Sequence, residues 1–200
     1  MLLILSGASG AGKSTLCARL LEAYPSMQLS VSYTTRAPRG QEVDGVAYHF
    51  ITEPVFSAMV AAGRFAEHAR VHGNWYGTSS EATQRAVADG HTVLFDVDYQ
   101  GAEALQRAFP DAVSVMVLPP SWEALEGRLR ARGTDAAAVI ARRLAKARDE
   151  MAHFGSFTYL VVNDDLETAV SRLRAIVEAE RCRTARVAAG LRILDGIKVA

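Results

Sequence analysis

Residues 7–15 read GASGAGKST, and these residue types at this spacing can hold phosphate groups. The pattern G-x-x-x-x-G-K-[ST] puts glycines where the backbone must curl, so that successive N–H groups can point at phosphate oxygens. Lys13 can reach β- and γ-phosphates, and the Ser14 hydroxyl can ligate Mg²⁺. The stretch therefore predicts a nucleoside triphosphate site in preference to a glycine-rich turn of a Rossmann-like fold. The residues expected to line the triphosphate are Gly7, Ala8, Ser9, Gly10, Ala11, Gly12, Lys13, Ser14 and Thr15.

Short apolar runs alternate with helical patterns along the chain, and this alternation predicts how the motif is positioned. The apolar runs cover residues 2–5, 92–95, 113–118 and 160–162, and they are typical of buried parallel strands. Helical patterns cover residues 13–23, 80–88, 123–130, 136–151 and 167–186. The order strand, phosphate loop, helix indicates an α/β fold of the P-loop NTPase class with a parallel sheet at its core.

One region departs from this alternation. Roughly from residue 28 to residue 74 the chain shows strand-like alternation, many turn residues and a short helical pattern near residues 54–62. We expect an inserted subdomain with its own small sheet at residues 31–79. The core is then expected at residues 1–30, 80–120 and 150–186, with residues 121–149 as a short lid and residues 187–200 as a tail.

Composition narrows the function classes. The 200 residues carry 22 Lys plus Arg and 22 Asp plus Glu, and this zero net charge argues against a nucleic-acid or membrane-surface binder. No apolar stretch reaches transmembrane length, and no basic leader precedes the first apolar run. The two cysteines, Cys17 and Cys182, match no metal-ligand spacing and fit a reducing cytoplasmic compartment.

Two arginines in the insertion suit a second phosphate. Arg36 and Arg39 flank a proline and follow the hydroxyls of Ser32, Thr34 and Thr35. Paired guanidiniums can bind a phosphate dianion bidentately. An ordinary solvated loop is the alternative interpretation of this segment.

Two carboxylates follow the apolar run at residues 92–95. If that strand continued, Asp96 and Asp98 would point to the same side of it, at the carboxyl end where α/β folds bind ligands. The alternative for either residue is a helix-capping or turn aspartate.

Taken together, these segments resemble the guanylate kinase family, bacterial type, whose members phosphorylate GMP with ATP. The matching pieces are GASGAGKST, SVSYTTRAPR, EVDGVAYHF, FAEHARVHGNWYGT, FDVDYQG, LPPS, RARGTD and VVNDD. They occur in the family's order and cover the chain to about residue 183. The resemblance makes the insertion a GMP-binding subdomain and the segment around Arg132 the lid. One departure is Gly40-Gln41-Glu42, where the glycine stands one position earlier than in the family's G-E-x-x-G segment.

The resemblance also implies roles for individual residues. Lys13, Arg132 and Arg143 match catalytic positions, and Asn163 matches a contact on the adenine side of ATP. Asp96 is expected near Mg²⁺, through water, beside Ser14. The residues implied to hold GMP are Arg36, Arg39, Tyr48 and Tyr76 at its phosphate, and Ser32, Glu67, Thr78 and Asp98 at its guanine edge.

The implied reaction is transfer of the γ-phosphoryl group of ATP to GMP, or to dGMP, with Mg²⁺. A phosphate monoester is already mostly ionised at neutral pH, so we expect no general base. Two alternatives stay open. One is another small P-loop kinase, such as the related enzyme acting on a ribose bisphosphate, which would not need Glu67, Thr78 and Asp98 together. The other is a catalytically inactive guanylate-kinase-like domain that binds phosphopeptides, which intact Lys13, Arg132 and Arg143 argue against.

Overall fold

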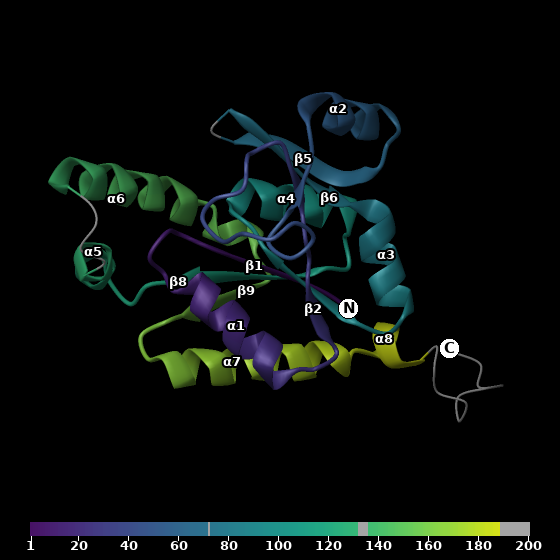
Figure 1. Ribbon diagram of the computed structural model, residues 1–200. Helices are drawn as coiled ribbons and strands as arrows, with labels where there is room; N and C mark the ends of the chain where they lie inside the picture. The colour runs from purple at the N-terminus through teal and green to yellow at the C-terminus, as the bar shows by residue number, and fades with distance from the viewer. Residues whose placement is uncertain (72, 132–135, 189–200) are drawn as a thin grey trace.

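The computed structural model describes residues 1–71, 73–131 and 136–188. Five parallel strands form the central sheet in the order β2-β7-β1-β8-β9 (Figure 1). Their bounds are β1 Leu2–Gly7, β2 Met27–Leu29, β7 Thr92–Asp96, β8 Val113–Leu118 and β9 Tyr159–Val162. The four strands predicted from apolar runs are confirmed, and β2 adds an edge strand that is too short and too exposed to stand out in the sequence.

Helices cover both faces of this sheet, as its apolar strands require. One face packs against α1 (Lys13–Ala23) and α7 (Leu166–Arg181), which lie side by side below the sheet in Figure 1. The other face packs against α4 (Tyr99–Ala108) and α3 (Ser80–Ala88). Helix α8 (Thr184–Val187) follows α7. The phosphate motif thus lies at the end of the central strand, held between two packed layers.

Cys17 is buried within the α1 face of the core, and burial raises the pKa of its thiol to about 12. The thiol is therefore a packing group rather than a nucleophile. Both Cys17, which is buried, and Cys182, which is exposed, are free cysteines.

A second sheet lies above the first in Figure 1 and has the order β4-β3-β6-β5. Its strands are β3 Tyr33–Thr34, β4 His49–Phe50, β5 Phe65–Val71 and β6 Asn74–Ser79, with α2 (Glu53–Ala61) packed against β5. Phe56 of α2 stacks on Phe65 and on Trp75, which gives this small sheet an apolar core of its own. All four strands lie within residues 31–79, where the sequence predicts an insertion.

Helices α5 (Trp122–Ala131) and α6 (Ala137–Ala152) project together from one side of the molecule (Figure 1). Leu125 and Leu129 of α5 pack with Ile140 and Ala147 of α6. Ala8 of the phosphate loop belongs to the same cluster, so this helix pair touches the loop directly. Within the described parts of the chain, none of the helices is long and apolar enough to cross a membrane.

Helix α4 is where the sequence prediction was wrong. Strand β7 ends at Asp96, and Asp98 is the N-cap of α4, with its side chain accepting a hydrogen bond from the Gly101 N–H at 2.9 Å. Asp96 and Asp98 therefore do not share one strand face. The structure bears out the capping alternative for Asp98, and the helix that it caps, which buries Ala102 and Leu105, is absent from the elements predicted from the sequence.

Candidate active site

The phosphate loop curls because two of its glycines adopt backbone conformations that other residues avoid. Gly10 and Gly12 both have φ of 94°, and Gly12 is the N-cap of α1. Asn163, from the end of β9, lies buried against the loop and donates a side-chain hydrogen bond to the Ala11 carbonyl at 2.8 Å. A Cβ on Gly12 would collide with this Asn163 amide. Asn163 thus fixes the position of the loop backbone at Ala11 and Gly12.

We expect Gly12→Ala to lower both stability and nucleotide binding. The methyl group would strain the positive φ and push Asn163 off the loop, at a cost of roughly 1–3 kcal/mol. Gly63→Ala is the matched control, because Gly63 also has a positive φ of 64° but nothing within 4 Å of its Cβ position. Thermal melts and ADP titrations should show ADP binding weakened only in Gly12→Ala. Equal ADP affinity in both variants would contradict the role of the close approach between Gly12 and Asn163.

Lys13 connects the phosphate loop to the end of β7. Its Nζ donates to the Val97 carbonyl at 2.6 Å and lies 2.8 Å from Asp96 Oδ1, at the end of β7. The ammonium group is thus held at the mouth of the loop. A cavity of about 260 Å³ opens here, lined by the loop together with Asp98 and Glu150.

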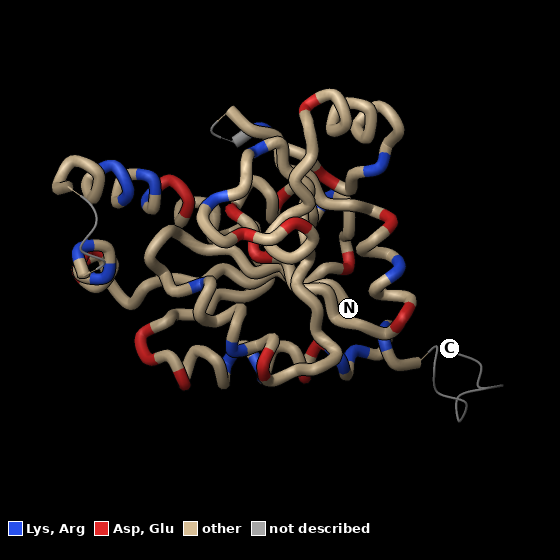
Figure 2. Tube along the Cα trace, viewed as in Figure 1, with Lys and Arg blue, Asp and Glu red and all other residues tan. Residues whose placement is uncertain are grey.

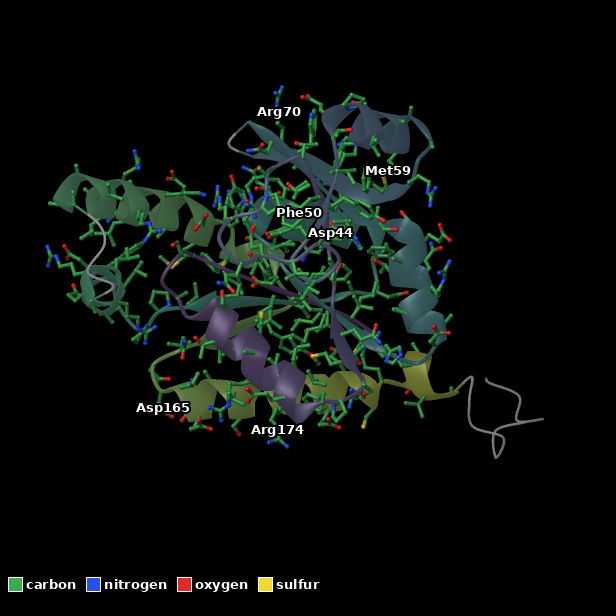
Figure 3. The ribbon with its side chains drawn as sticks, viewed as in Figure 1. Asp44, Phe50, Met59, Arg70, Asp165 and Arg174 are labelled. Atoms are coloured by element: carbon green, nitrogen blue, oxygen red, sulfur yellow. The ribbon has the colours of Figure 1, made fainter. Side chains whose placement is uncertain are left out.

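Arg36 lies buried in the insertion, with 8% of its side chain exposed. It donates to Glu42 Oε1 at 2.9 Å and to the Ala37 carbonyl at 2.7 Å, and its guanidinium carbon lies 5.3 Å from the centre of the Tyr48 ring. Phe50, labelled in Figure 3, is the second ring near it, at 5.8 Å. The guanidinium is therefore held in one orientation, and its Nε is buried without a hydrogen-bond partner.

Glu42 is a residue of this site that the sequence interpretation missed. Its second carboxylate oxygen accepts the Arg39 backbone N–H at 2.7 Å, and this bond together with Arg36 lowers the pKa of Glu42. Glu42 therefore closes the segment from Arg36 to Arg39 into a compact turn. The segment's unusual glycine position was the available signal, because Gly40 lies two residues before Glu42.

The hydroxyls beside these arginines have structural partners. Thr34 Oγ1 donates to the Trp75 carbonyl at 2.9 Å, and Thr35 Oγ1 accepts the Trp75 N–H at 2.9 Å. Both hydroxyls therefore have partners within the insertion, and their contribution to a phosphate site stays a prediction. They join β3 to β6, which fixes Arg36 relative to Tyr76 across the small sheet.

Glu67 and Thr78 face each other across β5 and β6. The Thr78 hydroxyl donates to Glu67 Oε1 at 2.6 Å, and Thr78 is buried. Burial raises the pKa of Glu67, and the charge of Asp98 raises it further against the opposing Thr78 bond. The insertion thus brings Glu67 into the electrostatic field of Asp98, which lies on the core.

The remaining predicted residues fall into three groups. Tyr48 and Tyr76 meet edge to face with ring centroids 5.8 Å apart, while the side chain of Arg39 is exposed. Arg143 lies on α6 and is half-buried. Arg132, the other predicted lid arginine, lies outside the described residues, as does the end of the predicted tail.

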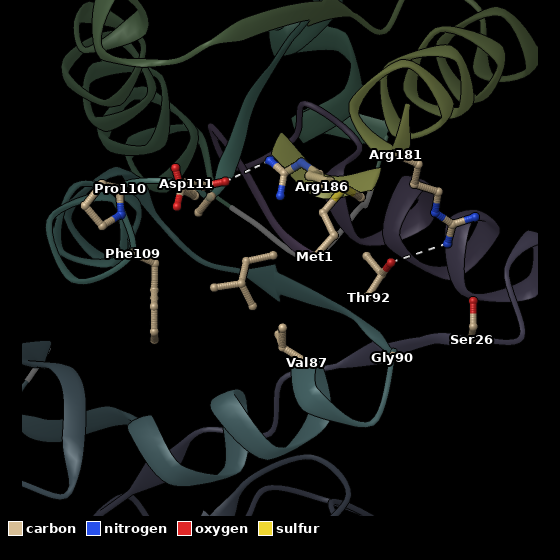
Figure 4. Close-up of a pocket in the computed structure, with 12 residues that line it drawn as sticks. Met1, Ser26, Val87, Gly90, Thr92, Phe109, Pro110, Asp111, Arg181 and Arg186 are labelled. Atoms are coloured by element: carbon tan, nitrogen blue, oxygen red, sulfur yellow. Dashed lines mark hydrogen bonds between the residues drawn. The ribbon is translucent and has the colours of Figure 1, made fainter. Parts of the chain in front are cut away.

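A larger cavity of about 540 Å³ lies at the opposite edge of the sheet (Figure 4). Arg181 and Arg186 line it, but Arg186 donates to the Asp111 carbonyl at 2.8 Å and Arg181 to Thr92 at 3.3 Å. Strands begin at this edge, whereas ligands of open α/β sheets bind where strands end. The cavity beside the phosphate loop is therefore the candidate active site, although it is the smaller one.

Comparison with known proteins agrees with this geometry. A family model described as guanylate kinase matches residues 1–180. The guanylate kinase of Syntrophotalea carbinolica is 50% identical over 187 residues, which cover 94% of this chain and 89% of that protein. The guanylate kinase of Aromatoleum aromaticum is 50% identical over 184 residues, covering 92% and 90%. The crystal structure of guanylate kinase from Anaplasma phagocytophilum superposes with a TM-score of 0.75 at 32% identity, covering 100% of this chain and 96% of that one.

Proposed function

Because the chain belongs to the guanylate kinase family, enzymes that phosphorylate GMP with ATP, we propose a specific route for the transfer. The γ-phosphoryl group passes from ATP at the phosphate loop to the phosphate of GMP, or of dGMP, held by the insertion. Family membership sets aside both alternatives left open by the sequence, the kinase of a ribose bisphosphate and the inactive binding module.

One observation carries the proposal: both halves of the site converge on the end of β7. Lys13 reaches from the phosphate loop to Asp96 and Val97. One residue later Asp98 caps α4, the helix that packs against β5, and β5 carries Glu67 of the insertion. A donor bound at the loop and an acceptor bound between Glu67 and Asp98 would therefore meet there. This supports direct transfer between two bound nucleotides.

On the acceptor side, the phosphate of GMP would be held by Arg36, Arg39, Tyr48 and Tyr76. Arg36 supports this role best, because Glu42 and the Tyr48 ring fix its guanidinium in advance. A preorganised guanidinium loses little conformational entropy when it binds a phosphate. Since the residues assigned here reach the phosphate and the base, dGMP fits the same site.

The guanine edge would be recognised by Ser32, Glu67, Thr78 and Asp98. Guanine offers one acceptor, O6, and donors on N1 and N2. Ionised carboxylates accept hydrogen bonds, so Glu67 and Asp98 suit N1–H and the N2 amino group, while the Ser32 hydroxyl suits O6. Thr78, whose hydroxyl donates to Glu67 Oε1, would hold that carboxylate in place at the guanine edge. Adenine would leave buried groups unpaired, which is the stronger form of discrimination.

The chemistry would come from charge neutralisation and alignment. A phosphate dianion is already a competent nucleophile, so the site has no need of a general base. Lys13 and the loop N–H groups would stabilise negative charge on the transferring phosphoryl group. Arg143 and Arg132 would add positive charge from the lid. Closing the insertion and lid over both nucleotides would exclude water and so prevent hydrolysis of ATP.

The residues present fit Mg²⁺ carried in with ATP. The exposed Ser14 hydroxyl and the Asp96 carboxylate are hard oxygen donors beside the loop. The described residues hold no group of three His, Cys, Asp or Glu that could form a dedicated metal site. Ser14 would thus bind the ion directly and Asp96 through water, and the ion would neutralise charge on the β- and γ-phosphates.

The raised pKa of Glu67 predicts how GMP binding depends on pH. As pH falls through this pKa, which lies above the ordinary glutamate value, Glu67 becomes protonated and one hydrogen-bond acceptor for guanine is lost. We expect KM for GMP to rise on acidification, while KM for ATP stays level over the same range. In Glu67→Gln, KM for GMP should be high and flat with pH.

Inosine monophosphate, which lacks the N2 amino group, tests the same contact. We expect the wild type to use it at least ~10-fold less efficiently than GMP, since one unpaired buried acceptor costs about 1–3 kcal/mol. Glu67→Gln and Asp98→Asn should narrow this gap in kcat/KM. If both variants keep the wild-type ratio of kcat/KM for GMP over inosine monophosphate, and the wild-type pH dependence of KM for GMP, these carboxylates do not recognise the base.

A further inference from the structure

Glu150 is a buried carboxylate that the proposed reaction does not use. It lies near the end of α6 with 9% of its side chain exposed, and it lines the cavity of the phosphate loop. Its Oε2 accepts the backbone N–H of Ser9, a loop residue, at 3.4 Å. A negative group thus occupies part of a loop whose N–H groups are suited to phosphate.

The charge of Glu150 is only partly balanced. Lys146, one turn earlier on α6, approaches Glu150 Oε1 at 3.4 Å but is itself 53% exposed. Lys13, at the end of the phosphate loop, is engaged by Asp96 and Val97. A triphosphate entering the loop would therefore meet a carboxylate whose counter-charge among the described residues, Lys146, is largely solvated. Like charges at this range repel strongly where water is scarce.

Glu150 is also mechanically linked to the lid. Helix α6 packs on the loop through Ala147 and Ala8, and it carries Arg143 two turns before Glu150. Basic residues follow one another along α6, and acidic ones come at its end beside the core (Figure 2). The hydrogen bond between α6 and the loop is thus made by a carboxylate, Glu150. A phosphate group carries the same sign of charge and accepts the same N–H, so it would displace this carboxylate.

We propose that Glu150 is a positioning residue that imitates a phosphate in the empty site. In the nucleotide-free enzyme its carboxylate occupies the Ser9 N–H and holds the base of α6 against the loop. The phosphates of ATP displace it, and α6 then moves and brings Arg143 toward the transferring group. This inference rests on the proposed assignment of the loop as the ATP site.

The test measures ADP binding by calorimetry in EDTA, so that no metal contributes. Glu150→Gln keeps the shape and removes the charge, and we expect it to bind ADP roughly 10-fold tighter than the wild type. Asp149→Asn is the matched control, because Asp149 is the neighbouring exposed carboxylate of the same helix; its ADP affinity should stay within about 2-fold, since exposed charges are screened. Glu150→Asp, one methylene shorter, should fall between wild type and Gln, and it provides the test if the Gln variant fails to fold.

Amide hydrogen exchange in α6 gives a second measurement, because a purely structural role of Glu150 would not make this exchange depend on ADP. In the wild type, ADP should increase amide exchange in the last turns of α6, whereas in Glu150→Gln that exchange should already be high without ADP. Equal or weaker ADP binding by Glu150→Gln in EDTA would overturn the inference. In a parallel titration with Mg²⁺, a loss of affinity that is absent in EDTA would make Glu150 a metal partner and would also overturn it.

Lys13→Met serves as the reference: if it abolishes ADP binding while the Glu150 variants change nothing, only this inference fails. If Lys13→Met also leaves ADP binding intact, the ATP-site assignment fails.

Discussion

Lys13→Met is expected to lower kcat by about 10³-fold or more while leaving the protein folded, the scale seen for central charge-stabilising groups. Methionine fills similar space but carries no charge. The ammonium is held at the mouth of the loop by Asp96 and the Val97 carbonyl, so its charge is in place before the nucleotide arrives. In the transition state that charge would stabilise the oxygens of the transferring phosphoryl group.

The matched control for Lys13→Met is Arg19→Met on the same helix. Arg19 is bound to Glu167 of α7 at 2.7 Å, away from the loop, and exposed ion pairs of this kind contribute little. Its kcat should stay within about 2-fold of the wild type. Turnover would be measured by ADP release and folding by thermal melts. A folded Lys13→Met protein with near-normal turnover would contradict the assignment of the phosphate loop.

Arg39→Ala is expected to raise KM for GMP by roughly 10–100-fold, the loss of one hydrogen bond between charged partners. KM for ATP should change little, because Arg39 lies on the insertion. Its side chain is exposed and its backbone N–H is held by Glu42, so truncation should remove the guanidinium without unfolding the turn.

Arg70→Ala controls for losing any arginine of the insertion. Arg70 is exposed and packs over Trp75, with its guanidinium carbon 5.7 Å from the ring centroid. We expect its KM for GMP to stay close to that of the wild type. If Arg39→Ala raised KM for ATP as much as KM for GMP, the phosphates of the two nucleotides would not occupy separate sites.

The parts of the fold that the sequence predicts are those with local causes. Strand β1 follows from an uninterrupted apolar run, and the loop after it follows from glycines that must adopt positive φ. The cap of α3 is equally local, since the Ser79 side chain accepts the Ala82 N–H three residues later. Such signals need no knowledge of the rest of the chain.

Contacts between distant segments left no comparable signal. Glu150 meets Ser9 across 141 positions, and nothing in the sequence of α6 distinguishes it from its exposed neighbour Asp149. Asn163 was assigned to the adenine side by resemblance, yet its described amide contact is with the Ala11 carbonyl of the loop. The direction of a side chain near a motif depends on tertiary packing, which the spacing of residues does not encode.

The most direct test of the account is kcat/KM of the wild-type enzyme for GMP, AMP, CMP and UMP, measured by coupled ADP release at fixed Mg·ATP. In the function proposed above, Glu67, Thr78 and Asp98 would make the acceptor site specific for a base with donors on N1 and N2 and an acceptor at O6. We therefore expect GMP to exceed each of the others by at least ~100-fold, since sites that hydrogen-bond their substrate reject partners lacking those groups most strongly. Phosphorylation of AMP or CMP within about 10-fold of GMP would contradict recognition of the guanine edge.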